Sequence, residues 1–454
     1  MYDVIIAGGG PSGAIAALAA ARAGSKVLVI EKNAFLGGMN TAAMVCPLMT
    51  FHSGKHQVIQ GIPEEIIREM VALSGSLGHI PDPLGVTSTI TPIEPEILKS
   101  VYFKLFSKEP NIELLLHSIL VGAEWDQGVV KSIKVANKKG LANYSAKVFI
   151  DATGDGDLAA FCKAEYAQGR AKDGFSQPMT LMFKMGNVNF EEIYTYMENN
   201  PEQFIIDKNC DIKKYLAVSG FFDLVGRAKA KGDLTLPRDR VLFFEGVGKG
   251  EIFVNMTRVI KRKGTDVWEL SLAEEEGNKQ VMEAVAFMKN YLPGFSNSIL
   301  MQIAPLIGVR ETRRITGRYT LCEDDITNGA THEDSIAVCA FPIDIHDPVS
   351  SNLTWIHQSE PNAYDIPFRT MVVKKFKNLL VTGRCISATH EAMASSRISA
   401  TAMALGEAAG TAASIILSNT NDARDFSKID IKTLQSTLRA NGAIYSKAQF
   451  CNNI

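Results

Sequence analysis

Residues 4–32 read VIIAGGGPSGAIAALAAARAGSKVLVIEK and join two short apolar runs through glycines and alanines. Val4–Ala7 has the composition of a buried strand. Ala14–Ala23 is rich in helix-forming alanine and stops at Gly24, a natural helix end. A second apolar run, Val27–Ile30, follows at once. This order predicts a strand, a tight turn, a helix and a parallel strand, which is a βαβ unit.

The glycines of this unit have the spacing of a dinucleotide-binding turn, in which the glycines permit the turn and let backbone approach a pyrophosphate. The diphosphate would lie at the helix N-terminus, whose free N–H groups and dipole favour anions. Glu31 follows the second strand and is placed to accept the ribose hydroxyls. The residues predicted to contact the dinucleotide here are Gly8, Gly10, Pro11, Ser12, Gly13 and Glu31.

The next segment, EKNAFLGGMNTAA, indicates which dinucleotide binds. It resembles flavoproteins in which the ribose-binding acid is followed by a Gly-Gly loop that passes under the flavin. That resemblance implies FAD, with contacts from Lys32, Gly37, Gly38, Met39, Asn40 and Thr41. NAD in the same glycine loop is the alternative, and a purified protein without yellow colour would favour it.

Farther along, residues 95–108 have apolar positions at helical spacing, and residues 112–151 contain three apolar runs separated by two turns, which predicts a β-meander. The last run ends in Ala152, Thr153 and Gly154. In FAD domains of the glutathione-reductase type, which this pattern resembles, such an Ala-Thr-Gly crosses the adenine-ribose side. The alternative is a plain acidic turn or a helix N-cap at Asp157.

Residues 165–368 carry no second phosphate loop, so a pyridine-nucleotide disulfide reductase, which has two, is disfavoured. GVGKG at 246–250 lacks a following helix pattern and is interpreted as a hairpin. The clusters of Pro, Gly and Asp near 198–212 and 342–367 are interpreted as surface loops or insertions.

The pattern of residues 378–417 predicts a buried strand, a loop and a long helix of small residues. Together with the earlier motifs, this block resembles the FAD-dependent oxidoreductase family. The resemblance implies further FAD contacts from Gly383, Arg384, Arg397 and Ala400. It also implies an α/β fold: a Rossmann-like FAD-binding domain with a three-stranded β-meander, formed by 1–164 and 369–454, and an inserted mixed α+β substrate domain at 165–368.

A flavin dehydrogenase also needs a group that fixes the charge of its substrate and a group that carries a proton. Arg310 and Arg397 are the preferred anion-binding residues, because a guanidinium binds a carboxylate with two parallel hydrogen bonds. His390, after the Gly383 loop, is the preferred proton carrier, and His52 is second. Cys46 could form a covalent thioether with the flavin, although a small buried hydrophobe is the favoured interpretation.

The predicted function is hydride transfer between a small anionic organic substrate and FAD. A flavin isomerase, hydratase or lyase without net redox turnover is an alternative, as is a non-catalytic redox sensor. The electron acceptor is unknown: oxygen, a quinone and a carrier protein are all compatible with the sequence.

The near balance of charge, at a net of −2, gives no basic field for nucleic acid. Seven scattered cysteines contain no CxxC pair and suggest neither a metal site nor a disulfide framework. No apolar run is expected to span a membrane, and the absence of a signal-like start favours a cytoplasmic protein. The sequence makes no prediction of oligomeric state.

Overall fold

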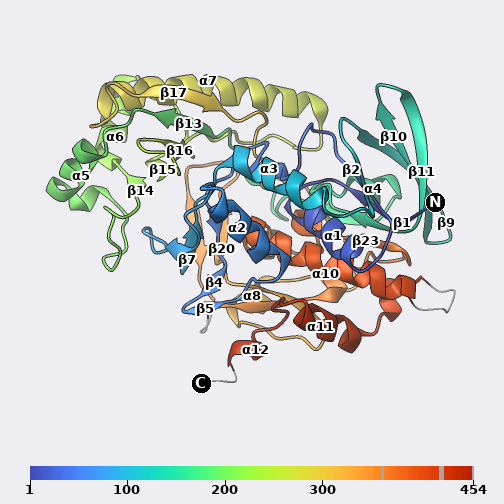
Figure 1. The fold of residues 1–454 in the computed structure, drawn as a ribbon. Coiled ribbons are helices and arrows are strands. Elements are labelled where there is room, and N and C mark those ends of the chain that lie inside the picture. The colour runs from blue at the N-terminus through green and yellow to red at the C-terminus, as the bar shows by residue number, and fades with distance from the viewer. Residues whose placement is uncertain (359–361, 419–423, 452–454) are drawn as a thin grey trace.

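The computed structural model describes residues 1–358, 362–418 and 424–451, and Figure 1 shows their arrangement. Two larger sheets and several short strand pairs alternate with helices, so the predicted α/β class is confirmed.

The larger sheet has seven strands and carries the predicted βαβ unit. In order the strands are β8 (Ile112–Leu115), β2 (Val27–Ile30), β1 (Tyr2–Ala7), β11 (Gly140–Asp151), β10 (Val129–Asn137) and β9 (Ile119–Asp126), with β23 (Leu379–Val381) beside β11. The strand β11 pairs in parallel with β1 and β23 through its second half and antiparallel with β10 through its first half. It therefore joins the parallel strands and the antiparallel ones into one sheet.

A second, antiparallel sheet of five strands lies within 165–368, and the long helix α7 (Val267–Tyr291) runs along it in Figure 1. In order the strands are β14 (Ala217–Gly220), β15 (Val241–Glu245), β16 (Ile252–Val254), β13 (Phe183–Gly186) and β17 (Ile299–Ile303). The segment 246–250 connects the neighbouring antiparallel strands β15 and β16, which confirms the predicted hairpin.

Short strands complete the β structure. They are β3 (Leu48–Met49), β4 (His52–Ser53), β5 (His56–Gln57), β6 (Ile80–Pro81), β7 (Thr89–Thr91), β12 (Tyr166–Gln168), β18 (Arg313–Ile315), β19 (Ser335–Cys339), β20 (Ile343–His346), β21 (Leu353–Ile356) and β22 (Tyr364–Pro367). Of the two interpretations of 342–367, a surface loop or an insertion, the surface loop was wrong, because this segment contains the hairpin of β20 and β21 and the buried strand β22.

The helix predicted at 95–108 is present as α3 (Pro95–Phe106). The helix α4 (Asp157–Phe161) has Gly156 as its N-cap, so Asp157 is a helix residue and not the cap. The other helices outside the centre of the fold are α2 (Ile62–Ala72), α5 (Phe190–Asn199), α6 (Phe222–Lys231), α8 (Glu323–Thr327), α9 (His390–Ser396), α11 (Ile431–Ala440) and α12 (Ala448–Cys451).

Two helices from distant parts of the chain pack against each other at the centre, α1 (Pro11–Arg22) and α10 (Ser399–Ser418), as Figure 1 shows. Glycines make the approach close: a Cβ on Gly406 would lie 2.1 Å from the carbonyl oxygen of Ser12, and one on Gly410 would lie 2.2 Å from that of Ala16. The two backbones therefore touch where any larger residue would separate them.

The helix α10 also has the length and apolarity of a membrane span, with a mean hydropathy of 1.4, although no apolar run of this kind was expected from the sequence. Of that apolar window, 78% is buried inside the fold. Its apolarity is therefore accounted for by its central position in the core.

One carboxyl on α10 is buried among these helices. Glu407 is 1% exposed and accepts a hydrogen bond of 3.0 Å from the backbone N–H of Ile62, at the start of α2. Burial disfavours the charged form and raises the pKa of Glu407 to about 7. The folded protein thus holds a proton on Glu407 at pH values where the unfolded chain has lost it.

We expect Gly406→Ala to lower the free energy of unfolding by about 1–3 kcal/mol, because the added methyl group overpacks the contact between α1 and α10. Gly226→Ala in α6 is the matched control, since no atom lies within 4 Å of the position that its Cβ would take, and it should be neutral or slightly stabilising. Urea unfolding of both variants measures the difference, and equal stabilities would contradict the packing argument.

We also expect the stability difference between Glu407→Gln and the parent to depend on pH. The folded pKa lies above the unfolded one, so the contribution of Glu407 is present below about pH 4.5 and is lost as the pH rises to 7. The free energy of unfolding of the variant should therefore rise relative to that of the parent across this pH range, by on the order of 2–3 kcal/mol at pH 8. Exposed Glu275→Gln should show a flat difference in the same unfolding series.

Candidate functional site

The glycine turn between β1 and α1 has the geometry that a dinucleotide requires. Gly8 has a φ of +99°, and a Cβ on Gly13 would lie 1.9 Å from the carbonyl oxygen of Gly8. The helix α1 begins with Pro11, and no side chain caps it. Its first N–H groups are thereby available to an anion such as a diphosphate.

Glu31 lies at the carboxyl end of β2, as expected for the ribose-binding acid, and is 5% exposed. Its Oε2 accepts the N–H of Gly9 at 2.7 Å, and its Oε1 accepts the backbone N–H of Asn33 at 2.8 Å. The carboxylate therefore also fixes the glycine turn. The neighbouring Lys32 is exposed.

The Gly-Gly loop packs on the same turn. Gly37 has a φ of +103° and donates its N–H to the carbonyl of Gly9 at 2.9 Å, and a Cβ on Gly38 would lie 2.8 Å from the Cα of Gly10. Two buried side chains hold the rest of the loop. Thr41 donates to the carbonyl of Leu36 at 2.8 Å, and Asn40 donates to the carbonyl of Val45 at 2.9 Å.

The predicted cofactor segments at Ala152 and Gly383 also lie against the glycine turn and the start of α1. The carbonyl oxygen of Ala152 would lie 2.4 Å from a Cβ on Gly8, and Ser12 Oγ would lie 2.7 Å from one on Gly383. Next to them, Thr153 donates to Asp151, whose pKa is raised to about 6 by burial. The structure thus brings four separate segments of the chain together around the start of α1.

Two further predicted residues lie nearby. Arg384 donates to the carbonyl of Val309 at 2.7 Å and to Asp155 Oδ1 at 2.6 Å, across from Gly154. Ala400, in the first turn of α10, is fully buried.

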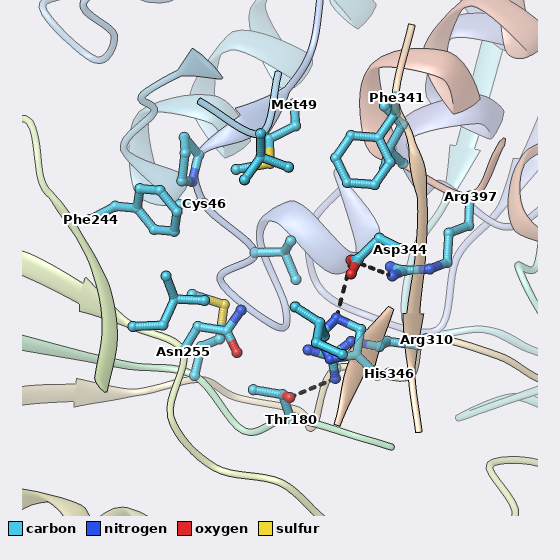
Figure 2. Close-up of a pocket in the computed structure, with 18 of the residues that line it drawn as sticks. Cys46, Met49, Thr180, Phe244, Asn255, Arg310, Phe341, Asp344, His346 and Arg397 are labelled. Carbon is cyan, nitrogen blue, oxygen red and sulfur yellow. Dashed lines mark hydrogen bonds and ion pairs between the residues drawn. The ribbon is translucent and has the colours of Figure 1, made fainter. Parts of the chain in front are cut away.

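A cavity of about 230 Å³ adjoins these loops (Figure 2). Met39 of the Gly-Gly loop and Arg384 line it, together with residues of the five-stranded sheet and of the hairpin β20–β21. Figure 2 shows apolar side chains, among them Met49 and Phe244, on one side and charged ones on the other. The cavity is therefore amphipathic and touches both the cofactor loops and the segment 165–368.

Both predicted anion-binding arginines line this cavity. Arg310 donates to the carbonyl of Pro178 at 2.8 Å and to Thr180 Oγ1 at 2.6 Å. Arg397 lies 3.4 Å from Asp344 Oδ2. Burial holds the pKa of the Arg310 guanidinium well below its usual value, and the positive charge of Arg397 adds to this effect.

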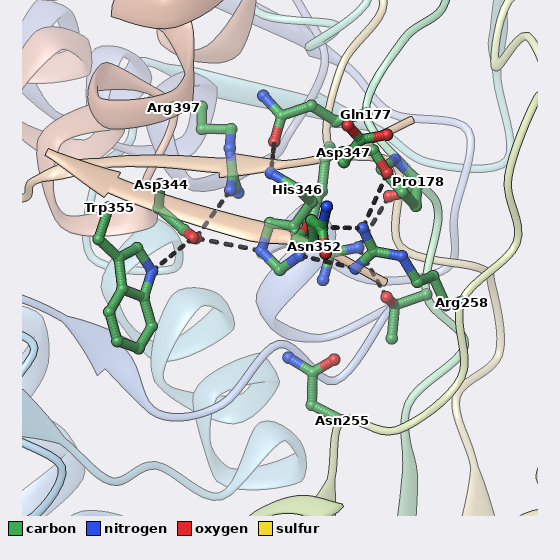
Figure 3. A network of polar contacts seen from close by, with 12 residues as sticks. Gln177, Pro178, Asn255, Arg258, Asp344, His346, Asp347, Asn352, Trp355 and Arg397 are labelled. Carbon is green, nitrogen blue, oxygen red and sulfur yellow. Dashed lines mark hydrogen bonds and ion pairs between the residues drawn. The ribbon is translucent and has the colours of Figure 1, made fainter. Parts of the chain in front are cut away.

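Asp344 is the centre of a polar network that sequence reasoning missed (Figure 3). Its Oδ1 accepts the indole N–H of Trp355 at 2.8 Å, and its Oδ2 lies 3.1 Å from His346 Nε2 and 3.4 Å from Arg397. Arg258 Nη1 lies 3.3 Å from His346 Nδ1. Because a guanidinium only donates, Nδ1 accepts and Nε2 carries the proton that is shared with Asp344.

Burial, together with the nearby arginines, keeps His346 neutral despite the neighbouring Asp344. Burial, and then the nearby Arg310, lower its pKa to about 3, and interactions with His346 and Arg397 hold the pKa of Asp344 below its usual range despite burial. Asp344 and His346 alternate along β20, so the pattern FPIDIH at 341–346 was the available signal: two ionisable residues on one face of an apolar strand.

His390, the preferred proton carrier, does not line the cavity. Its Nδ1 lies 2.9 Å from Glu311 Oε2, and Glu311 also accepts the backbone N–H of Gln177 at 2.9 Å and contacts Arg314. Both His390 and Glu311 are buried. The Nδ1 of His390 is therefore paired with Glu311, whereas its Nε2 is buried without a hydrogen-bond partner among the residues that the structure describes.

The two secondary candidates differ in position. His52 lies outside the cavity lining beside His79, at 5.1 Å between ring centroids, and burial lowers its pKa to about 4. Cys46 does line the cavity, but burial raises the pKa of its thiol well above the usual value. A thiol held in its neutral form is a poor nucleophile, which favours the packing interpretation of Cys46.

Comparisons with known proteins agree with this geometry. The family model described as FAD dependent oxidoreductase matches residues 3–438. A thiamine thiazole synthase from Methanococcus aeolicus is 32% identical over 167 residues, which is 35% of this chain and 57% of that protein. The chain thus spans little more than half the length of this relative.

Two solved structures have a TM-score of 0.50 to this chain, and both show a shared fold. The flavin-dependent brominase Bmp2 is 12% identical, with 97% of this chain and 83% of that chain covered. The flavin-dependent halogenase CmlS is 11% identical, with 97% and 63% covered.

We expect Asp344→Asn to destabilise the protein by on the order of 3–5 kcal/mol, because it leaves Arg397 and its neighbours without their buried countercharge. Asp239→Asn is the control, since that carboxylate pairs with Arg240 at a half-exposed site and should cost less than about 1 kcal/mol. Thermal unfolding measures both, and a similar cost for the two variants would refute the central position of Asp344.

Proposed function

Because the chain belongs to the family of FAD-dependent oxidoreductases, we propose that it transfers a hydride between a small anionic organic substrate and FAD. The observation that carries this proposal is the shared lining of the cavity. Met39 and Arg384 of the cofactor loops and the arginines Arg310 and Arg397 face the same space. An anion bound by these arginines would therefore lie beside the loops that hold the flavin.

The chain's own residues fit FAD. The turn at Gly8–Gly13 leaves room only for backbone and presents an uncapped helix start, which suits the diphosphate, and Glu31 is placed for the ribose. We assign the flavin to the loops at 37–41 and 383–384. Bound there, FAD would supply the hydride acceptor or donor. The segments 1–164 and 369–454 would form the cofactor domain, with 165–368 supplying the substrate wall.

Each charged residue has a distinct task in this proposal. Arg310 and Arg397 fix the negative charge of the substrate, and Asp344 orients Arg397. His390 holds Glu311, which fixes the segment carrying Arg310, so we assign His390 a positioning role. The apolar side chains of the cavity exclude water from the space where the hydride would move.

The proposal predicts that the purified protein carries flavin and that one member of a panel of small carboxylates bleaches it under anaerobic conditions. Arg310→Gln should raise the KM for that substrate by roughly 10–100-fold, since a hydrogen bond between charged groups is lost. Arg262→Gln, at a loose surface ion pair of 3.7 Å with Glu276, should leave the KM unchanged.

The rival functions give different results in the same experiment. Product formed without bleaching would favour an isomerase, hydratase or lyase. Flavin that dithionite reduces but that no metabolite reduces would favour a redox sensor. Either outcome would contradict hydride transfer.

A further inference from the structure

The cavity carries more positive charge than its own carboxylates balance. Arg240 pairs with Asp239 at 2.9 Å, and Arg384 pairs with Asp155. Arg397 lies beside Asp344. Three other arginines at the site form no ion pair with a carboxylate of the described residues: Arg238, Arg258 and Arg310.

Two of these three unpaired arginines line the cavity itself. Arg310 is bound only through a carbonyl and a hydroxyl, and Arg238 is bound through the carbonyl of Asn255, at 2.9 Å from its Nη2. Arg258 stands behind His346 and donates to the carbonyls of Asp347 and Asn352. The first two guanidiniums therefore remain for a ligand, and the third strengthens the positive field around them.

Arg238 is the less expected of the two, because no sequence motif marks it. It lies between α6 and β15, is 6% exposed, and its Nε is buried without a hydrogen-bond partner among the residues that the structure describes. Burial and the neighbouring charge of Arg258 lower its pKa to about 10, which still leaves it protonated at neutral pH. An unpaired buried charge is costly unless an anion compensates it.

The opposite wall of the cavity has a different chemistry. It is formed by apolar side chains from the 45–49 segment and from β15, and Figure 2 shows Met49 and Phe244 there, away from His346 and Arg310. Such a wall gains free energy by burying an apolar group and offers few polar partners.

We propose that the substrate is an organic dianion with an apolar body, and that Arg238 binds its second negative charge beside Arg310 and Arg397, which bind the first. This inference rests on the proposed function, because it names the substrate class of the same cavity. A dicarboxylate and a phosphate monoester share this chemistry, since each presents two negative charges next to a carbon skeleton. Arg238 is then a specificity-determining residue that selects a dianion over a monoanion.

The test measures binding to the FAD-loaded protein by isothermal titration and by the flavin difference spectrum, so it does not depend on turnover. The probes are benzylsuccinate, benzyl phosphate, 3-phenylpropionate and succinate. We expect at least one of the two aromatic dianions to bind roughly 10–100-fold more tightly than 3-phenylpropionate, and more tightly than succinate, which lacks the apolar body. The tighter of the two identifies the headgroup.

The variants assign the second charge to Arg238. Arg238→Gln should weaken binding of the favoured dianion by roughly 10–100-fold and that of 3-phenylpropionate by less than about 3-fold. Arg238→Lys keeps the charge and should recover part of the selectivity, and Arg262→Gln should change neither affinity. Circular dichroism and bound flavin establish that each variant is folded, and Arg238→Lys keeps the test decisive if the glutamine variant does not fold.

Equal affinity for the dianions and 3-phenylpropionate, or an equal loss for both in the folded Arg238 variants, would overturn the inference. Its failure differs from failure of the proposed function. Selective dianion binding without any bleaching by a substrate would overturn hydride transfer and support the dianion site. Bleaching by a monoanion, with no dianion selectivity, would overturn the dianion site alone, whereas bleaching by a neutral compound would also contradict the anionic substrate of the proposed function.

Discussion

The contact between α1 and α10 is the constraint on which the rest of the structure depends. Gly406 and Gly410 let the backbone of α10 touch that of α1, which fixes the distance between segments far apart in the chain. The loop at Gly383 is held against Ser12 by the same approach. Ser399 begins α10, Arg397 caps α9 just before it, and both line the cavity. The helix contact therefore also sets where Arg397 lies relative to the cofactor loops.

Much of the cofactor side could be predicted because its physical requirements are local. A turn that must pass close to other backbone needs glycine at fixed positions. A strand followed by such a turn and a helix is therefore specified by a stretch of about thirty consecutive residues. The loops at Gly37 and Gly383 follow the same logic, since each glycine has a positive φ and a neighbour that a Cβ would strike. The spacing of the glycines was therefore sufficient to predict the cofactor loops.

The polar side of the cavity could be predicted only in part, since Arg310 and Arg397 were expected there and line the cavity but its other charged residues were not expected. Arg238, Asp344 and His346 come from different parts of the chain, and only the tertiary fold brings Arg238 to the other two. His390 illustrates the converse: its place in the sequence, after the Gly383 loop, suggested proximity to the flavin, but its side chain pairs with Glu311. Which way a side chain faces depends on packing partners that lie far away in the sequence.

The apolarity of α10 also has a consequence for how the protein is made. During translation, α1 leaves the ribosome roughly 20–75 s before α10, at rates of about 5–20 residues per second. For that interval, the small-residue surface of α1 lacks the helix that finally covers it, and the nascent N-terminal unit has no complete core. The helix α1 can therefore complete its packing only after residues 399–418 have been synthesised.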